Sequence, residues 1–249
     1  GVAFQRRSRL GEAVGNYAFR NTAITAISLK NVTSIGTEAF HGCASLKTAE
    51  VSGRLLTIGE KAFAGCAALE SINLTTGLKT IGEMAFADCT SLKSINLPST
   101  LTSLSGNPFS GCSGVTSFTV DSGNKSFIYK NGALFDKTSF TLIYYSAANT
   151  ADTYILPDSV HQILSGAFAG SQLKTFEIPA TSNITEIPAD AFRNSKLLTS
   201  VVIPATIKKI GDNAKETGTS IVSAFSKINP VFIGAGAAIA AGVIAFEAW

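Results

Sequence analysis

The feature that most constrains this chain is a motif that returns every 23 residues. A Phe is followed three residues later by a Cys, and the Phe usually follows an Ala. A fixed period of this length is the mark of a solenoid, in which each repeat hides its apolar side only by stacking on its neighbours. The repetition therefore predicts one elongated array. The four pairs are Phe40 and Cys43, Phe63 and Cys66, Phe86 and Cys89, and Phe109 and Cys112.

A second apolar pattern keeps step with the first. In runs such as Leu69, Ile72 and Leu74, apolar residues alternate with polar ones at the end of the run. This alternation predicts a short strand with one buried side. A single apolar position follows each of these runs, and a Gly often comes directly after it. Each coil is thus expected to hold a strand, a turn, a second extended stretch and a tight corner that carries Ala-Phe. The recurring apolar position is occupied by Ile35, Ile58, Ile81, Leu104, Ile163, Ile187 and Ile210.

Residues 121–157 interrupt the period, because Phe109 and Phe168 are 59 residues apart. Two aromatic and apolar runs, 127–129 and 134–135, flank the pair Asn131-Gly132, which is a strong signal for a hairpin turn. A further strand is expected over 142–145. The sequence predicts a small β insertion that packs on the edge of the coils, with its aromatic side chains forming a local core.

The four cysteines occupy equivalent places in successive coils. Stacked coils hold equivalent side chains about 4.8 Å apart and parallel, whereas a disulfide needs closer Cβ atoms turned toward each other. A buried ladder of free thiols is therefore favoured over disulfides. Zinc is the other alternative, but ligands 23 residues apart lack the close pairs of zinc sites.

Composition argues against several classes of function. The net charge of +3 is spread along the chain, so the basic face of a nucleic-acid binder is missing. The two histidines, His41 and His161, have no partner at a triad or metal-ligand spacing, and no nucleophile elbow, phosphate loop or zinc motif occurs. We therefore expect no catalytic residue, no metal and no cofactor, and a protein that is not an enzyme.

The outward positions of the predicted strands form two polar columns. A flat face rich in hydroxyl and amide groups, extended by repetition, is a candidate surface for a protein or cell-surface ligand. The alternative is that these side chains bond one another and stabilise the stacked strands. The candidate binding face is Thr48, Glu50, Ser71, Asn73, Ser94, Asn96, Ser117, Thr119, Thr175, Glu177 and Ser200.

Four Asn-x-Ser/Thr sequons would accept glycans if the protein passes through a eukaryotic secretory pathway. Asn73 lies in the candidate binding face, so a glycan there would argue against that face. The sequons are at Asn31, Asn73, Asn124 and Asn183.

The unit LESINLTTGLKTIGEMAFADCTS at residues 69–91 and its neighbour LKSINLPSTLTSLSGNPFSGCSG at 92–114 resemble the 23-residue leucine-rich repeats of the BspA-like family. The resemblance covers about residues 14–214. It implies an α+β or all-β repeat class, a leucine-rich-repeat solenoid of about seven to eight short β-coils with a small β insertion. It also implies a non-enzymatic protein at the cell surface or secreted, which mediates adhesion to proteins or cells. The alternative is an intracellular repeat scaffold, which suits free thiols and the lack of a visible signal region.

The ends of the chain differ from the array. Residues 1–13 are expected to be irregular, with the array starting in the middle of a repeat, and Lys215 stands where the next Phe is due. An incomplete gene product and a natural cap both fit these ends. Within the C-terminal segment 215–249, Pro230 to Phe246 is uncharged, and a membrane-spanning helix is favoured over a capping helix. A processed lipid-anchor signal is a third alternative.

Overall fold

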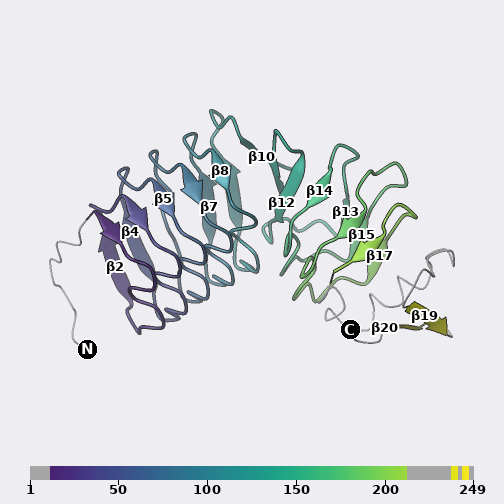
Figure 1. Cartoon of the computed structure of the whole chain (residues 1–249), viewed down its shortest axis with the longest axis horizontal. Helices are drawn as coiled ribbons and strands as arrows, with labels where there is room; N and C mark the ends of the chain where they lie inside the picture. The colour runs from purple at the N-terminus through teal and green to yellow at the C-terminus, as the bar shows by residue number, and fades with distance from the viewer. Residues whose placement is uncertain (1–11, 212–236, 241–242, 247–249) are drawn as a thin grey trace.

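A computed structural model describes residues 12–211, 237–240 and 243–246 of the chain. These residues form an all-β solenoid of about nine turns, and no helix occurs among them. Figure 1 shows the coils stacked side by side along the long axis of the molecule. The predicted solenoid is thereby confirmed. Its strands are β1 (Ala13–Val14), β2 (Ala26–Leu29), β3 (Ser34–Ile35), β4 (Thr48–Val51), β5 (Thr57–Ile58), β6 (Thr80–Ile81), β7 (Ser94–Leu97), β8 (Ser103–Leu104), β9 (Ser117–Val120), β10 (Phe127–Lys130), β11 (Ala133–Asp136), β12 (Thr141–Tyr145), β13 (Thr153–Ile155), β14 (Gln162–Ile163), β15 (Thr175–Glu177), β16 (Glu186–Ile187), β17 (Ser200–Val202), β18 (Lys209–Ile210), β19 (Ala237–Ala240) and β20 (Val243–Phe246).

Two parallel ladders run along the array, one for each extended stretch of the coil. The first ladder contains the longer strands, which pair as β2-β4, β7-β9 and β13-β15-β17, with Ser71 bridging to Thr48. The second ladder contains the two-residue strands β1-β3-β5-β6-β8 and continues in β12-β14 and β16-β18. In both ladders equivalent residues pair, as Ile58 does with Ile81, so every coil repeats its neighbour's register. The regular spacing of the apolar residues produces this register, because any shift would turn them toward solvent.

The phenylalanines at the corners form a continuous buried stack. Ring centroids of consecutive coils lie 5.0 Å apart between Phe40 and Phe63 and 5.4 Å apart between Phe63 and Phe86. Their planes differ by only 8° and 2°. Offset parallel rings at this separation attract each other beyond their area of burial. The stack runs from Phe19, which is half-buried at the first coil, to Phe109.

The four cysteines are buried and free, and each thiol has a specific partner. The Sγ atom of Cys66 donates to the carbonyl oxygen of Phe40 at 3.1 Å, and Cys89 donates likewise to Phe63 at 3.2 Å. In the C-terminal coils a serine takes this place, and Ser195 Oγ donates to the Phe168 oxygen at 2.7 Å. The small side chain at this corner position therefore satisfies a buried carbonyl of the preceding coil, in addition to filling space.

The tight corners depend on backbone conformations that few residues adopt. The position two residues after each corner Phe is left-handed and holds Gly42, Gly65 and Gly111, or a residue such as Asp88 with a φ of 57°. Asn and Asp tolerate this region better than other non-glycine residues because their short side chains bond locally. The left-handed backbone at this position explains why it is occupied by glycine, asparagine or aspartate.

Residues 121–157 contain the expected hairpin. β10 and β11 are antiparallel, and Asn131 and Gly132 form the two-residue turn with φ values of 51° and 83°. Positive φ at both residues is the geometry of the type I′ turn that matches the twist of the strands. The segment does not only pack on the edge of the coils, as the sequence predicted; part of it is a strand of the solenoid. β12 pairs antiparallel with β11 and parallel with β14, so it stands in the second ladder itself.

The insertion joins two hydrophobic cores. We call residues 12–120 the N-terminal half-array and residues 153–211 the C-terminal half-array; β10 and β12 lie between their coils in Figure 1. Tyr144 packs with Phe109 and Phe118 of the first core, and Tyr145 packs with Tyr154 and Phe168 of the second. Adjacent residues of a strand point to opposite faces, so this one pair closes both cores.

The C-terminal apolar segment differs from the sequence prediction where it is described. Ala237–Ala240 and Val243–Phe246 form an antiparallel pair, β19-β20, instead of a helix. β-branched Ile239, Val243 and Ile244 favour extended backbone, and each strand supplies the other's hydrogen-bond partners. Within the described residues, no helix has the length and apolarity needed to cross a bilayer. Residues 1–11 and 212–236 lie outside the described part, and with them most of the two predicted end segments and the start of the 230–246 stretch.

Candidate functional site

The candidate binding face is presented by the outward side of the first ladder. In the N-terminal half-array its eight residues are all exposed, whereas Thr175, Glu177 and Ser200 of the C-terminal half-array are half-buried. Ser94 is in register with Ser117, and Asn96 with Thr119, so the two columns follow the ladder as the sequence predicted. The structure therefore brings residues 48–119 of the set together on one strip. The remaining three lie on β15 and β17, beyond the insertion.

Hydrogen bonding within this strip is sparse. Thr119 Oγ1 donates to Asn96 Oδ1 at 3.0 Å, and Glu50 forms an exposed ion pair with Lys30 at 3.0 Å. Among the described residues no side-chain hydrogen bond joins Thr48, Ser71, Ser94 and Ser117 to one another. Side-chain hydrogen bonds between neighbouring strands thus join one pair on this face, Thr119 and Asn96. The hydroxyl groups of Thr48, Ser71, Ser94 and Ser117 are left exposed to solvent.

The same face changes character in the C-terminal half-array. Ile155, Glu177 and Val202 are in register across β13, β15 and β17, and Ile155 and Val202 are 56% and 47% exposed. The sequence pattern did not place Ile155 on this face, because the residue lies within residues 121–157, where the period is interrupted. The face of the C-terminal half-array thus carries two exposed apolar side chains, Ile155 and Val202, on either side of Glu177.

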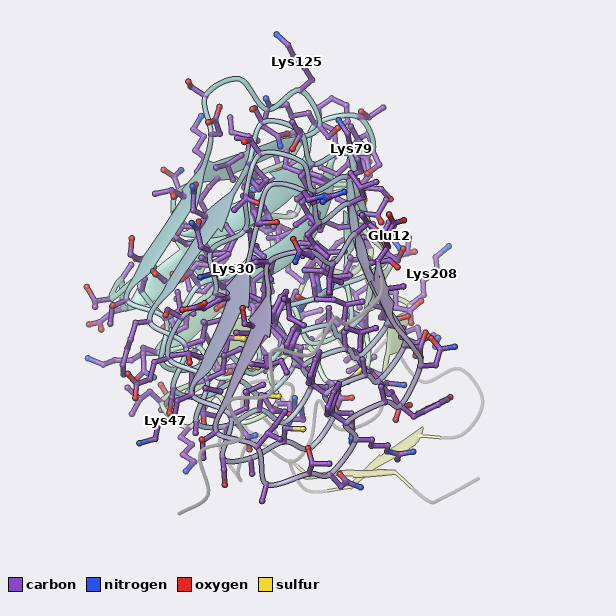
Figure 2. All side chains as sticks on the ribbon, turned by 90° about the vertical axis from the view of Figure 1, so that its left-hand side faces the viewer. Glu12, Lys30, Lys47, Lys79, Lys125 and Lys208 are labelled. Atoms are coloured by element: carbon purple, nitrogen blue, oxygen red, sulfur yellow. The ribbon has the colours of Figure 1, made fainter. Side chains whose placement is uncertain are left out.

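Charged side chains do not gather on any one side of the described array. Figure 2 looks along the molecule from its N-terminal end, and the labelled Lys47, Lys125 and Lys208 project in three different directions. Histidines are equally dispersed. His161 is exposed and packs against Phe140 with ring centroids 5.4 Å apart, while His41 is half-buried at a corner. Within residues 12–211 no group of three His, Cys, Asp or Glu side chains is placed to hold a metal ion.

Three of the four sequons are on the surface, at Asn31, Asn73 and Asn183. The prediction for Asn124 needs correction, because this residue is 1% exposed. Its amide nitrogen donates to the carbonyls of Pro98 and Leu101, and its oxygen accepts from the amides of Ser126 and Phe127. Asn124 thus pins the start of the hairpin onto the preceding coil and has no free amide to offer a glycan in the folded chain.

Two grooves beside the hairpin were not found by sequence reasoning. One, of about 340 Å³, lies between β9 and β10; the other, of about 390 Å³, lies between the hairpin and the segment 154–160. Ile128 is common to both, and it is 41% exposed although it lies in a strand. An apolar residue on the solvent side of a hairpin was the only signal in the sequence, and periodicity could not interpret it inside the insertion.

Stacked coils with two parallel ladders, buried leucine and isoleucine positions and a corner phenylalanine define a leucine-rich-repeat β-solenoid. The sequence matches the BspA type leucine rich repeat region, in six copies, over residues 12–141 and 143–235. This protein therefore belongs to the BspA-type leucine-rich-repeat family, as its repeats predicted.

Two solved structures of similar fold are of bacterial proteins. The pneumococcal vaccine antigen PcpA has a TM-score of 0.62 and 22% identity, over 80% of this chain and 62% of that one. A leucine-rich repeat protein from Eubacterium ventriosum has the same TM-score and identity, over 78% and 58%. A leucine rich cell surface protein from Faecalibacterium prausnitzii gives 0.45 and 22%, over 82% and 73%. The chain spans about three fifths of the first two relatives. A search of curated proteins finds no match.

Proposed function

We propose that this protein is a non-enzymatic surface protein whose polar strip, residues 48–119 of the candidate binding face, binds a protein or a cell-surface ligand. The observation that carries the proposal is the row of exposed hydroxyl groups at Thr48, Ser71, Ser94 and Ser117, which do not bond one another. Repetition at the ladder spacing extends these groups into a continuous surface. Family membership supports a binding role, because this class of repeat proteins is typically non-enzymatic.

The chemistry of the strip favours many weak contacts over a few strong ones. Binding hot spots are enriched in Trp, Tyr and Arg, and none of these residues lies among the candidate positions. Such a surface gains strength from multivalent engagement, as on a cell or on a repetitive ligand. Adhesion at the cell surface, or by a secreted form, is the function that fits this chemistry best. Attachment to a membrane through the segment 230–246 is part of the same proposal.

The experiment compares cell binding by two charge-matched variants of the full chain. Ser71→Arg with Ser117→Arg places two long cations two coils apart on the strip. Leu56→Arg with Thr102→Arg places the same charges two coils apart at exposed positions beside the second ladder. We expect the first variant to bind intact cells at least about tenfold more weakly and the second to bind like the wild type. Equal binding by all three proteins would refute the strip as the adhesive surface.

The free thiols favour one other candidate, an intracellular repeat scaffold, since reducing compartments keep cysteines unpaired. Protease treatment of intact source cells distinguishes the surface protein from the intracellular scaffold. Protein accessible to a protease added outside intact cells supports the surface assignment, and protected protein supports the scaffold.

A further inference from the structure

We propose that a partner protein adds an extended strand to the free edge of β13 and inserts an apolar side chain into the 390 Å³ groove beside the hairpin. This site is separate from the polar strip, so it does not rest on the proposed function. It arises because the first ladder is interrupted. Within the described part of the chain, β9 pairs only with β7 and β13 only with β15, although they are consecutive strands of this ladder.

The free edge of β13 presents unpaired backbone groups of known direction. Thr175 N donates to Asp152 O, and Leu156 N donates to Glu177 O, both at 2.8 to 2.9 Å. In a parallel strand alternate residues bond to opposite neighbours, so even-numbered residues of this strand face β15. The amide and carbonyl groups of Thr153 and Ile155 therefore face away from it. Among the described residues no hydrogen bond is formed by these groups, which makes the edge a template for another strand.

The groove beside this edge is lined mainly by apolar side chains. The hairpin supplies Ile128 and Phe135, the turn before β12 supplies Phe140, and the segment after β13 supplies Pro157 and Val160. Ile128 and Phe140 are 41% and 48% exposed, so an incoming apolar side chain would cover them. Burial of apolar surface of this kind is the main source of affinity at small pockets.

Tyr154 also lines the groove, and its ring packs into the second hydrophobic core against Tyr145 and Phe168. The groove thus combines an apolar lining with the unpaired backbone groups of the β13 edge, which is the composition expected for a peptide-binding pocket.

Charge at the rim indicates the chemistry of the partner. Lys137 Nζ donates to Asn124 O at 2.7 Å, and the Asp136 carboxylate accepts from the amides of Thr138 and Ser139. Lys130 lines the groove, is exposed, and forms no ion pair within the described part of the chain. With Lys130 and Lys137 against the single carboxylate of Asp136, the lining of the groove carries a net positive charge. We infer that the partner strand carries an acidic residue next to its apolar anchor.

The test uses the full chain and a fluorescein-labelled peptide of alternating character, Thr-Val-Thr-Leu-Asp-Thr, measured by fluorescence polarisation. Saturable binding is expected below about 1 mM. The same peptide with N-methyl groups on alternate amides, which cannot pair with a strand edge, should bind at least about tenfold more weakly. Binding that is absent at this concentration, or equal for both peptides, overturns the proposal.

Variants locate the site on the protein. Ile155→Pro removes the outward amide without touching the bonds to β15, and Ile155→Val keeps that amide. Ile128→Asp puts a charge in the groove, and Leu197→Asp puts the same charge at an equally exposed apolar residue elsewhere. We expect Ile155→Pro and Ile128→Asp to weaken binding at least about tenfold and both controls to stay within about twofold. Lys130→Glu should reverse the preference, so that a peptide with Lys in place of Asp binds better. Weakened binding by the two control variants would contradict the proposal. So would a Lys130→Glu variant that still prefers the Asp peptide to the Lys peptide.

Discussion

Arg193 Nη2 lies 3.0 Å from Asp88 Oδ1, although 105 residues of sequence separate the two. The pair crosses the junction between the half-arrays at their corners. It passes over Gly111, where an added Cβ would lie 3.2 Å from Arg193 Nη2. On the same side, Asn107 Nδ2 donates to the carbonyl of Gly166 at 3.0 Å. The corners of the two half-arrays thus contact each other directly, while the ladders on the other sides are separated by the insertion.

The first prediction concerns this ion pair. Both side chains are partly exposed, so Arg193→Ala should lower the free energy of unfolding by only about 0.5 to 1 kcal/mol. Asp88→Gly is the matched change, because glycine fits the left-handed backbone at that position. A double-mutant cycle by urea unfolding measures the coupling. Strictly additive effects would show that the contact contributes nothing to docking of the two half-arrays.

The second prediction concerns the phenylalanine stack. Phe86 is fully buried between two rings, and Phe86→Ala should lower the free energy of unfolding by about 3 to 5 kcal/mol. Phe19 is half-buried at the first coil and stacks on Phe40, with no second ring partner among the described residues, so Phe19→Ala should cost much less. Denaturant unfolding of both variants makes the comparison. Equal, small losses would contradict the role of the stack as the core.

The third prediction concerns the close approach of coils at Gly59. A Cβ at this position would lie 2.6 Å from the carbonyl carbon of Gly36 and 2.7 Å from the amide nitrogen of Thr37. Because both neighbours are backbone atoms, Gly59→Ala must separate two coils and should cost about 2 kcal/mol or more. Gly15→Ala is the control, since nothing lies within 4 Å of its Cβ position. Thermal unfolding should leave the control near the wild type.

The fourth prediction concerns pH. Burial raises the pKa of the Cys66 and Cys112 thiols to about 12, above the ordinary value near 9. The folded-state pKa lies above the unfolded value, so the thiols' contribution to stability is complete below about pH 9 and is lost as the pH rises toward about 12. Each thiol contributes a slope of up to about 1.4 kcal/mol per pH unit in this window. Unfolding free energies from pH 7 to 11 measure it.

The control for that experiment replaces all four cysteines with serine, the residue that the chain itself uses at Ser171 and Ser195. Tyrosine and lysine titrations remain in this variant, so the difference between the two proteins isolates the thiols. We expect the variant to lose less stability than the wild type above pH 9. Parallel curves would mean that the thiols are not buried as neutral groups.

The fifth prediction concerns Asn124. Asn124→Asp would replace an amide nitrogen that donates to Pro98 and Leu101 with an oxygen that repels both carbonyls. The expected loss of unfolding free energy is about 2 to 4 kcal/mol, because a buried charge would also lose its solvation. Asn183→Asp, at an exposed sequon, should change stability little. When the chain is secreted from a eukaryotic host, peptide mapping should find Asn124 without a glycan.

The sequence by itself determined everything that repeats. In a solenoid the partner of a residue lies one period away, so spacing alone placed the two ladders, the phenylalanine stack, the thiol column and the outward columns of residues 48–119. The local signal Asn131-Gly132 likewise specified its hairpin, because turn geometry depends on a few adjacent residues.

Only the tertiary structure decided what happens across the insertion. No fixed period relates Asp88 to Arg193, or Ile128 to Tyr154, so their proximity depends on how far the inserted strands displace one half-array from the other. The entry of β12 into the second ladder, the division of Tyr144 and Tyr145 between two cores, and the burial of Asn124 follow from that displacement. Contacts between segments of unequal length are set by packing of the whole chain, and local patterns carry no record of them.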